Sequence, residues 1–360
     1  VPMDKILRID MGAEGGPKVR TEPLGGYAGL GGRAMTSAIV AKEVPPLCHP
    51  LGADNKLVIA PGLLSGTTAA MSGRLSVGCK SPLTGGIKES NAGGQASQVL
   101  ARLGYAAIVL EGKPKDDTLY KVLVNKDGVT VTADNSLCML GNYDLVEKMK
   151  SEFSDKVACI SIGTAGEMKM AAASIAVTDM EQRPTRHAGR GGVGAVMGSK
   201  GVKVIVLDDA GMKMRPPKDP NKFKEANQAW VAGLRKHPVT GEGLPAYGTN
   251  VLTNVINEAG AYPTKNFMWG RFDGCSKISG ETQAETENTR GGKGSATHGC
   301  HRGCIIRCSG TYTDKDGHYM TKQPEYETVW AHGGNCGIDD LDAIAMLDRL
   351  DDDFGVDTIE

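Results

Sequence analysis

The chain has 360 residues, and its 41 Lys and Arg residues against 42 Asp and Glu residues give a formal net charge of -1. This balance excludes an electrostatic basis for binding nucleic acid or an anionic membrane surface, and no apolar run reaches the roughly 18 residues that a bilayer-spanning helix needs. The length predicts two or three domains. Scattered cysteines and an N-terminal segment without a signal-peptide pattern predict a cytoplasmic protein with reduced thiols.

The first 208 residues are predicted to form many short strands with few helices. Asn125–Gly128 places a glycine where a tight hairpin turn needs positive φ, and Tyr143–Phe153 has the apolar spacing of a helix. Because the helices are short and the crossovers irregular, we expect an α+β fold without an internal repeat. The predicted strands are Lys5–Asp10, Leu57–Ala60, Leu75–Cys79, Ala106–Leu110, Thr118–Val124, Val129–Thr132, Val157–Ile162 and Val202–Leu207.

The sequence changes character after residue 208, where we place the boundary between a β-rich domain (1–208) and the start of a mostly helical domain (209–360). Lys213–Pro220 has the prolines of a linker. Pro263–Gly294 is polar and glycine-bearing, and we expect more loop than regular structure there. Helices are predicted at Asn221–Lys236, Thr249–Ala259 and Ile338–Phe354, the last with Leu341, Ile344, Leu347 and Leu350 in one core-facing stripe.

Three of the nine cysteines, Cys300, Cys304 and Cys308, fall within nine residues. Thiolates this close together are soft ligands that suit zinc or an iron–sulfur cluster. Zinc sites usually add a second cysteine pair, and no second C-x-x-C follows here. Three such cysteines with a fourth supplied from afar is a ferredoxin-like ligand pattern. The alternatives are metal-free thiols on a surface loop and a broken zinc site.

Glycine is unusually frequent, at 49 of 360 residues, and gathers in four segments. Three of these segments place an arginine beside glycine (Arg33, Arg74 and Arg190), and another offers Asn91. Glycine lets backbone N–H groups approach an oxyanion, and arginine adds a bidentate contact to phosphate. The alternative is a set of tight turns in a β-rich domain. The segments are Gly25–Ala34, Ser72–Gly85, Lys88–Gly94 and Arg186–Lys200.

Known nucleotide-binding motifs fit these segments poorly. Gly189-x-Gly191-x-x-Gly194 matches the dinucleotide pattern, but the polar residues before it do not predict the strand that this motif requires. Gly198-Ser-Lys200 has the wrong residue order for a P-loop. We therefore expect a phosphate-bearing cofactor of another kind next to the cysteines.

A group of titratable residues follows the cysteines. Glu325, Tyr326, Glu327 and His332 border apolar residues. Burial of a carboxyl group in such surroundings would suit it to proton transfer. The alternative is a solvated acidic segment.

The chain resembles the aldehyde ferredoxin oxidoreductase family, the tungsten-pterin enzymes, in four runs that occur in this order: SGRLSVGCKSPLTG from Ser72, ESNAGG, AGRGGVGAVMGSK and PEYETVWAHGGNCGI. The resemblance covers essentially the whole chain. It implies a β-rich, saddle-like N-terminal domain that holds two pyranopterins chelating one tungsten, followed by a mostly α-helical domain. The implied activity is the oxidation of aldehydes to carboxylic acids with ferredoxin as electron acceptor, in a cytoplasmic homodimer.

The resemblance also implies which residues would bind the cofactors. Cys300, Cys304 and Cys308 match the first three ligands of a [4Fe–4S] cluster, and Arg74 would lie between that cluster and one pterin. The regions around Asn91 and Gly191 would reach a magnesium ion that bridges the pterin phosphates. The pterin-contacting positions would be Arg74, Asn91, Ala92, Gly93, Arg190, Gly191 and Gly192.

The implied catalytic residue is Glu327, beside the tungsten, as a general base or hydrogen-bond donor. Tyr326 precedes it in the matching run, and Glu325 is the less favoured choice. Glu327 would transfer a proton during aldehyde oxidation, whereas the cofactor would carry out the redox step.

Two features depart from the family pattern. Three residues separate Cys300 from Cys304, where the family usually has two. Family subunits also continue with a second helical domain that carries the fourth cluster cysteine and a second pterin-binding segment, so the chain resembles the N-terminal part of a longer polypeptide. The competing hypotheses are a reductive family member, such as the tungsten subunit of a ring-reducing complex, and a non-catalytic iron–sulfur or zinc-binding module.

Overall fold

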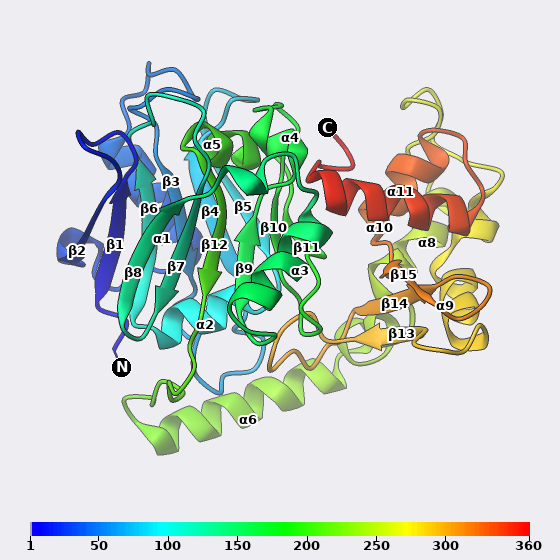
Figure 1. Cartoon of the computed structure of the whole chain (residues 1–360). Helices are drawn as coiled ribbons and strands as arrows, with labels where there is room; N and C mark the ends of the chain where they lie inside the picture. Colours follow the sequence, from blue (N-terminus) through cyan, green and yellow to red (C-terminus); the bar gives the residue numbers. More distant parts are fainter. Residues whose placement is uncertain (1) are drawn as a thin grey trace.

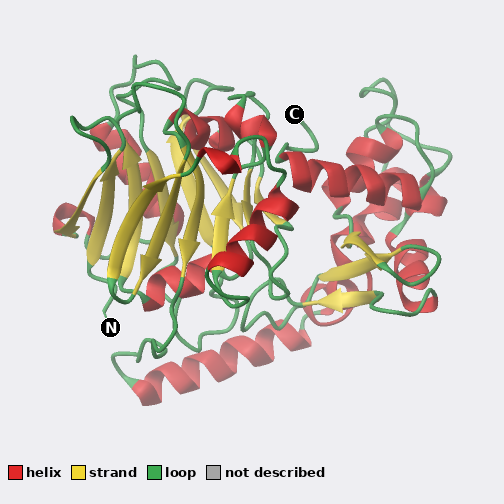
Figure 2. Ribbon diagram, in the orientation of Figure 1, coloured by secondary structure: helices red, strands yellow, loops and turns green. Residues whose placement is uncertain are grey.

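Figure 1 shows the computed structural model of the chain, which describes residues 2–360. Residues 5–207, drawn from blue to green, form two six-stranded sheets, and residues 220–354 form a smaller unit with a three-stranded sheet. Figure 2 shows most strands gathered in the first unit and a largely helical second unit. The predicted α+β class is confirmed. Within the described residues, no helix is both long and apolar enough to span a bilayer.

The first sheet has the strand order β2-β1-β6-β3-β4-β5. β1 and β2 form an antiparallel hairpin, β1 runs parallel to β6, and the other neighbours are antiparallel. The elements of this half are β1 (Lys5–Asp10), β2 (Lys18–Pro23), α1 (Gly32–Glu43), β3 (Leu57–Pro61), β4 (Leu75–Lys80), β5 (Ile87–Ala92), α2 (Ala96–Arg102) and β6 (Tyr105–Glu111).

The second sheet has the order β11-β10-β9-β12-β7-β8. Here β7 and β8 form the hairpin, β7 runs parallel to β12, and the other neighbours are antiparallel. Its elements are β7 (Tyr120–Asn125), β8 (Gly128–Ala133), α3 (Asn142–Glu152), β9 (Ala158–Ser161), α4 (Thr164–Glu167), β10 (Ile175–Val177), β11 (Arg186–Ala188), α5 (Val193–Ser199) and β12 (Val202–Leu207).

The two halves follow the same path, so the expectation of no internal repeat is wrong at the level of topology. Apart from the extra turn α4, each half runs through a hairpin, a helix, three strands, a short helix and a strand that returns parallel to the first. A given strand order requires apolar side chains at certain positions, but it does not require the same side chains in both halves. The two halves can therefore share a fold without detectable sequence similarity. The unpredicted strands are nearly wholly exposed (β2), mostly half-exposed (β5) or three residues long (β10 and β11).

Both sheets share one buried core, which also encloses the short helices α2 and α5. Leu7 of the first sheet and Ile160 of the second belong to it, together with Val99 of α2 and Val196 of α5. Because successive strand residues point to opposite faces, each sheet also buries an outer face, under α1 in the first half and under α3 in the second. The turns that follow β5 and β11 are thereby held at one side of the two-sheet unit.

The second unit begins with its longest helix, α6 (Pro220–Lys236), where the Asp219 side chain accepts hydrogen bonds from the first free amides. As expected, Pro263–Gly294 holds more loop than regular structure, but it also contains an unpredicted helix, α9 (Gly280–Thr289). This helix buries polar Gln283 and Glu287, so it has no apolar stripe. The other elements are α7 (Leu244–Tyr247), α8 (Leu252–Glu258), β13 (Ser295–His298), β14 (Ser309–Thr313), β15 (Tyr319–Lys322), α10 (Tyr326–Thr328) and α11 (Leu341–Phe354).

Candidate functional site

A cavity of about 620 Å³ lies between the two units. One wall comes from β5, β11 and the turns after them, and the other from β15, α10, α11 and the loop of residues 298–308, called the cysteine loop below. Most of the residues singled out in the sequence line it. These are Arg74, Asn91, Ala92, Gly93, Arg190, Cys300, Cys308, Glu325 and Glu327.

Arg74 and the turn after β5 form the first part of the wall. The Arg74 guanidinium donates from Nε to the Asn91 side-chain oxygen and from Nη2 to the Asn91 backbone oxygen, the latter at 3.3 Å. Asn91 in turn donates to Ser76 Oγ at 3.2 Å. A Cβ atom on Gly93 would lie 3.0 Å from Cys300 Sγ, tighter than ordinary packing. Glycine at 93 therefore lets the cysteine loop approach the sheet.

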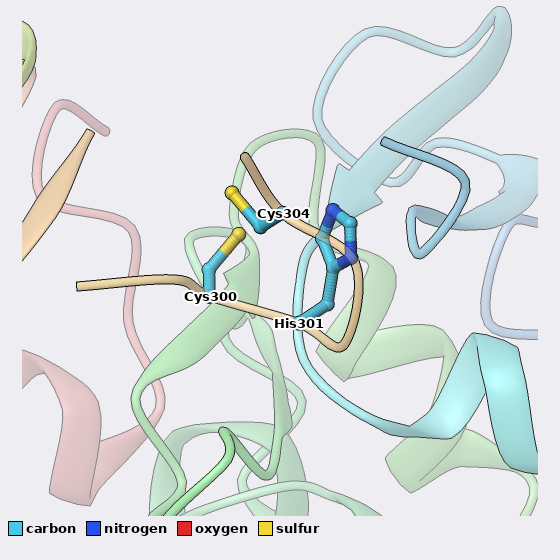
Figure 3. Close-up of side chains that lie close together, drawn as sticks. All are labelled: Cys300, His301 and Cys304. Carbon is cyan, nitrogen blue, oxygen red and sulfur yellow. The ribbon is translucent and has the colours of Figure 1, made fainter. Parts of the chain in front are cut away.

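The cysteine loop is anchored to this turn, because the Gly94 amide donates to the Cys300 carbonyl at 3.0 Å. One ligand atom each from Cys300, His301 and Cys304 lies within 4.8 Å of the others. In Figure 3 the sulfur atoms of Cys300 and Cys304 point toward each other. Their mutual interaction lowers the pKa of Cys304 to about 6 and raises the pKa of Cys300, so the two thiols titrate as a coupled pair in which Cys304 is the more acidic.

Cys308 completes the cysteine set at the beginning of β14. It lines the same cavity as Cys300, and burial raises the pKa of its thiol to about 11. A metal that binds the three sulfurs must displace these protons, because thiolates are the ligands. The three cysteines are evenly spaced in the sequence, but they lie on an irregular loop and not on a helix.

His301 is a neighbour of these thiols that sequence reasoning did not single out. It is 3% exposed, its Nδ1 lies 2.9 Å from the Arg302 carbonyl oxygen, and its Nε2 has no partner in the described part of the chain. A Cβ on Gly73 would come within 2.3 Å of the imidazole ring. The ring is thus packed against Gly73, and its place inside the cysteine run was the only signal in the sequence.

The turn after β11 forms a second part of the wall. Arg190 Nε lies 3.7 Å from an Asp357 carboxylate oxygen, and the Gly191 amide donates to Glu360 at 2.9 Å. Gly191 and Gly192 adopt φ of +97° and +68°, which glycine tolerates without strain. A short strand does precede Gly189, contrary to expectation, but β11 is an antiparallel edge strand. It therefore does not build a dinucleotide-binding unit.

A buried ionic network on α11 and β15 faces this turn. Lys322 Nζ lies 2.8 Å from Asp348 and 2.9 Å from Asp352, and His187 Nε2 lies 3.1 Å from Asp352. Burial alone would lower the pKa of Lys322, but the two carboxylates outweigh it and raise the pKa. The predicted apolar stripe of α11 is buried at Leu341 but exposed at Leu350, and Asp348 and Asp352 continue the buried face of the helix to the cavity.

In the acidic segment after β15, Glu325 and Glu327 line the cavity, whereas Tyr326 packs against another aromatic ring. Glu325 lies 3.6 Å from Arg186 Nη1 and accepts a hydrogen bond from Thr249 Oγ1 at 3.0 Å. Glu327 lines the cavity with an exposed side chain, so the expected burial of its carboxyl group is not found. The ring of Tyr326 packs edge-on against Tyr262, with 6.3 Å between centroids. The roles assigned to these residues stay predictions.

Comparison with known families defines the class of protein. Residues 6–209 match the family described as aldehyde ferredoxin oxidoreductase, N-terminal domain, and residues 225–360 match its domains 2 and 3. The chain therefore belongs to the aldehyde ferredoxin oxidoreductase family, and the resemblance in its four sequence runs is confirmed.

Two curated relatives align with most of this chain but with only about half of their own length. The tungsten-containing aldehyde ferredoxin oxidoreductase of Pyrococcus horikoshii is 40% identical over 332 residues, which cover 92% of this chain and 52% of the relative. An aliphatic sulfonate oxidoreductase, WOR-like subunit, of Pyrococcus furiosus is 26% identical over 350 residues, covering 91% of this chain and 53% of that protein. The chain spans about half the length of the curated relatives it matches.

A solved structure shares the fold. The active site complex BamBC of benzoyl coenzyme A reductase, in complex with 1,5 dienoyl-CoA, has a TM-score of 0.79 at 23% identity. The alignment covers 99% of this chain and 53% of that chain. The likeness concerns the arrangement of the elements, which therefore extends to both units described above.

Proposed function

We propose that the protein holds a tungsten–pterin cofactor in the cavity and oxidises aldehydes to carboxylic acids, with ferredoxin as electron acceptor. The single observation that carries this proposal is the convergence of two glycine turns, the cysteine loop and Glu327 on one cavity of about 620 Å³. Membership of the family supports it, as does the 40% identity to a relative named as a tungsten-containing aldehyde ferredoxin oxidoreductase.

The residues present fit a phosphate-bearing cofactor. The walls carry the cationic side chains Arg74, Lys88 and Arg190, and arginine suits phosphate oxygens through paired hydrogen bonds. His298, which also lines the cavity, has a buried Nδ1 without a partner in the described residues. Buried polar atoms normally have partners, so this atom points to a ligand. Pterin contacts are proposed for Arg74, Asn91, Ala92, Gly93, Arg190, Gly191 and Gly192, and a magnesium contact for Asn91.

The cysteine loop fits a [4Fe–4S] cluster. Cys300 and Cys304 already lie within ligand distance of each other, and Cys308 faces the same cavity. Thiolates hold all four irons of such a cluster, and these residues would supply three of the ligands. Arg74, held by its contacts with Asn91, would lie between one pterin and the cluster. His301 keeps zinc open as an alternative, because two thiolates and an imidazole are also zinc ligands.

When bound, the tungsten centre would supply the two-electron redox chemistry, and the protein would supply orientation and proton transfer. The exposed carboxylate of Glu327 can take or return a proton at its side-chain oxygens where it lines the cavity. Thr249 holds Glu325 by a hydrogen bond, and Arg186 lies beside it. Glu325 therefore has fixed partners, which leaves Glu327 as the better proton carrier.

The cofactor assignment is tested by metal and pterin analysis of the anaerobically purified protein. We expect tungsten, pterin and iron together, and a paramagnetic signal from the reduced cluster. Cys304→Ala should abolish or convert that signal while some tungsten remains, because it removes one iron ligand. Cys336→Ala is the matched control, since this exposed thiol lies outside the cysteine loop. Zinc without tungsten would favour the non-catalytic module, and an unchanged signal in Cys304→Ala would contradict the cluster assignment.

The catalytic assignment is tested by Glu327→Gln, which keeps the shape of the side chain and removes its titration. We expect turnover to fall by roughly 10²- to 10⁴-fold, the usual contribution of a positioned acid–base group, with tungsten, pterin and iron content retained. One limb of the pH–rate profile should flatten. Glu325→Gln is the paired variant and should lose less activity. A larger loss in Glu325→Gln would move the role to that residue.

A reductive reaction on the same cofactor is the second candidate. A relative at 26% identity that is named as an aliphatic sulfonate oxidoreductase subunit supports this candidate, because its name refers to a substrate other than an aldehyde. Aldehyde-dependent reduction of a viologen dye separates the two candidates. Its absence from a protein loaded with tungsten, pterin and iron would favour the second.

A further inference from the structure

The sequence run that contains Arg190 also contains Arg186, which has been described so far only as a neighbour of Glu325. Arg186 lies on β11, is 6% exposed and lines the cavity. Its Nη2 donates to Ser309 Oγ at 2.9 Å, and its Nη1 lies 3.6 Å from Glu325. Its Nε is buried and has no hydrogen-bond partner within residues 2–360. The guanidinium is therefore buried with only part of its bonding capacity used.

The surroundings of Arg186 are rich in sulfur. Ser309, which accepts its hydrogen bond, directly follows Cys308, and both Cys300 and Cys308 share the cavity with the guanidinium. Burial alone would lower the pKa of Arg186, but charge interactions with its neighbours, first Cys300 and then Asp179 and Glu325, raise it. Arg186 is therefore a permanent positive charge beside the cysteine loop.

A buried guanidinium is costly unless opposite charge compensates it. Glu325, at 3.6 Å and half-exposed, is a single and loose partner. A thiolate-ligated iron–sulfur cluster is anionic, and Cys300 and Cys308, which would hold it, line the same cavity as Arg186. Such a cluster would supply the counter-charge, and in a water-poor site its interaction with the guanidinium is only weakly screened. The potential of these clusters responds to neighbouring charge and hydrogen bonds.

We propose that Arg186 is a positioning residue that raises the reduction potential of the iron–sulfur cluster held by the cysteine loop. The inference rests on the proposed function, since it requires that cluster. Reduction adds one electron to the cluster and makes it more negative, without breaking a bond or moving a proton. A fixed positive charge stabilises the reduced form more than the oxidised form, so the potential is higher with Arg186 than without it.

The test is the midpoint potential of the cluster in the holoprotein, measured by paramagnetic resonance during a redox titration. Arg186→Met removes the charge and keeps much of the side-chain volume. We expect the ratio of reduced to oxidised cluster at a given potential to fall about tenfold, which for a one-electron couple is about 59 mV. Arg186→Lys keeps the charge and should restore most of the potential, which loss of packing alone would not explain.

Further variants make the test independent of folding defects. Arg307→Met is the matched control, because Arg307 directly precedes Cys308 but is exposed to water, where its charge is screened. Its effect should be much smaller. Glu325→Gln removes a negative charge next to Arg186 and should shift the potential upward. If Arg186→Met fails to assemble a cluster, Arg186→Gln, which also removes the charge but stays polar, takes its place, and an unchanged potential in that variant overturns the proposal.

The outcomes separate this inference from the proposed function. A wild-type protein without an iron–sulfur signal would overturn both. A wild-type signal whose potential is the same in Arg186→Met, or shifts equally in Arg307→Met, would overturn only the role of Arg186. A potential that falls in Arg186→Met and recovers in Arg186→Lys would establish it.

Discussion

The two halves of residues 5–207 follow one backbone path but end in turns that face different partners. In the first half, Asn91-Ala-Gly-Gly94 joins β5 to α2 and contacts the cysteine loop through the Gly94 amide. In the second half, His187-Ala-Gly-Arg-Gly-Gly192 joins β11 to α5, and His187 contacts Asp352 on α11. The fold thus provides two similar turns, after β5 and after β11. Contacts with different parts of the second unit give the two turns different chemical surroundings.

The outer faces of the two halves differ in a second way, through their ion pairs. In the first half, Arg8 is 4% exposed and lies 2.7 Å from Glu43 and 2.6 Å from Glu22. In the second half, Lys121 lies 3.1 Å from Asp134 and 2.5 Å from the more exposed Glu152. Removing one partner of a buried pair leaves an uncompensated charge, whereas exposed pairs contribute little.

The largest expected effect follows from this contrast. Arg8→Met should lower the free energy of unfolding by up to about 3–5 kcal/mol, because it removes the central cation of a buried network in which Lys56 still contacts Glu43 but Glu22 loses its cation. Lys121→Met in the other half should cost less than Arg8→Met, because Lys121 contacts two carboxylates, one of them exposed, whereas Arg8 contacts three. Denaturant unfolding of both variants measures the difference. Equal losses would mean that the two halves depend on their ion pairs to the same degree.

Strands with continuous apolar runs could be predicted most directly. Leu57–Ala60 and Ala106–Leu110 both correspond to strands in the structure, because strands buried on both faces are apolar throughout. β2 escapes prediction because it is nearly all exposed, and α9 because its buried side chains include Gln283 and Glu287. Burial of polar residues depends on partners far away in the sequence, which no local pattern records.

A second prediction uses the glycines of the equivalent turns. Gly94 has φ of +91°, and a Cβ there would lie 2.6 Å from the Thr178 carbonyl oxygen. Gly191 has φ of +97°, but its Cβ would meet only the flexible Lys88 side chain. Left-handed backbone costs a non-glycine residue about 1–2 kcal/mol, and a clash that the backbone must absorb adds about 1–3 kcal/mol.

Gly94→Ala should therefore destabilise the protein by about 2–5 kcal/mol, and Gly191→Ala by about 1–2 kcal/mol. Thermal and denaturant unfolding of the two variants provide the comparison. If Gly191→Ala is the more damaging change, then Lys88 is held rigidly, and the second turn is packed as tightly as the first.

The residues of the candidate site could be predicted where their type and spacing serve few purposes in proteins other than binding a metal or a phosphate. Three cysteines in nine residues and arginines among glycines are such signals, and the structure brings Cys300, Cys308, Arg74 and Arg190 to one cavity. Their chemical roles stay predictions. Lys322 and its carboxylate partners could not be found, because a lysine near acidic residues is usually on the surface. Only the packing of α11 against β15 buries the group.

The smallest expected effect is the pH dependence of stability in the first half. Burial alone would raise the pKa of Glu43, but hydrogen bonds from Arg8, Lys56 and Tyr27 lower it from 4.5 to about 2. A carboxyl group with a lowered folded-state pKa contributes stability that is present above its unfolded-state pKa and is lost as the pH falls toward the folded-state value. The melting temperature should therefore drop between about pH 4.5 and pH 2. In Arg8→Met this slope should flatten, because the main partner of Glu43 is gone, while Lys121→Met should keep it. An unchanged slope in Arg8→Met would place the acid sensitivity in other carboxylates, such as those around Lys322.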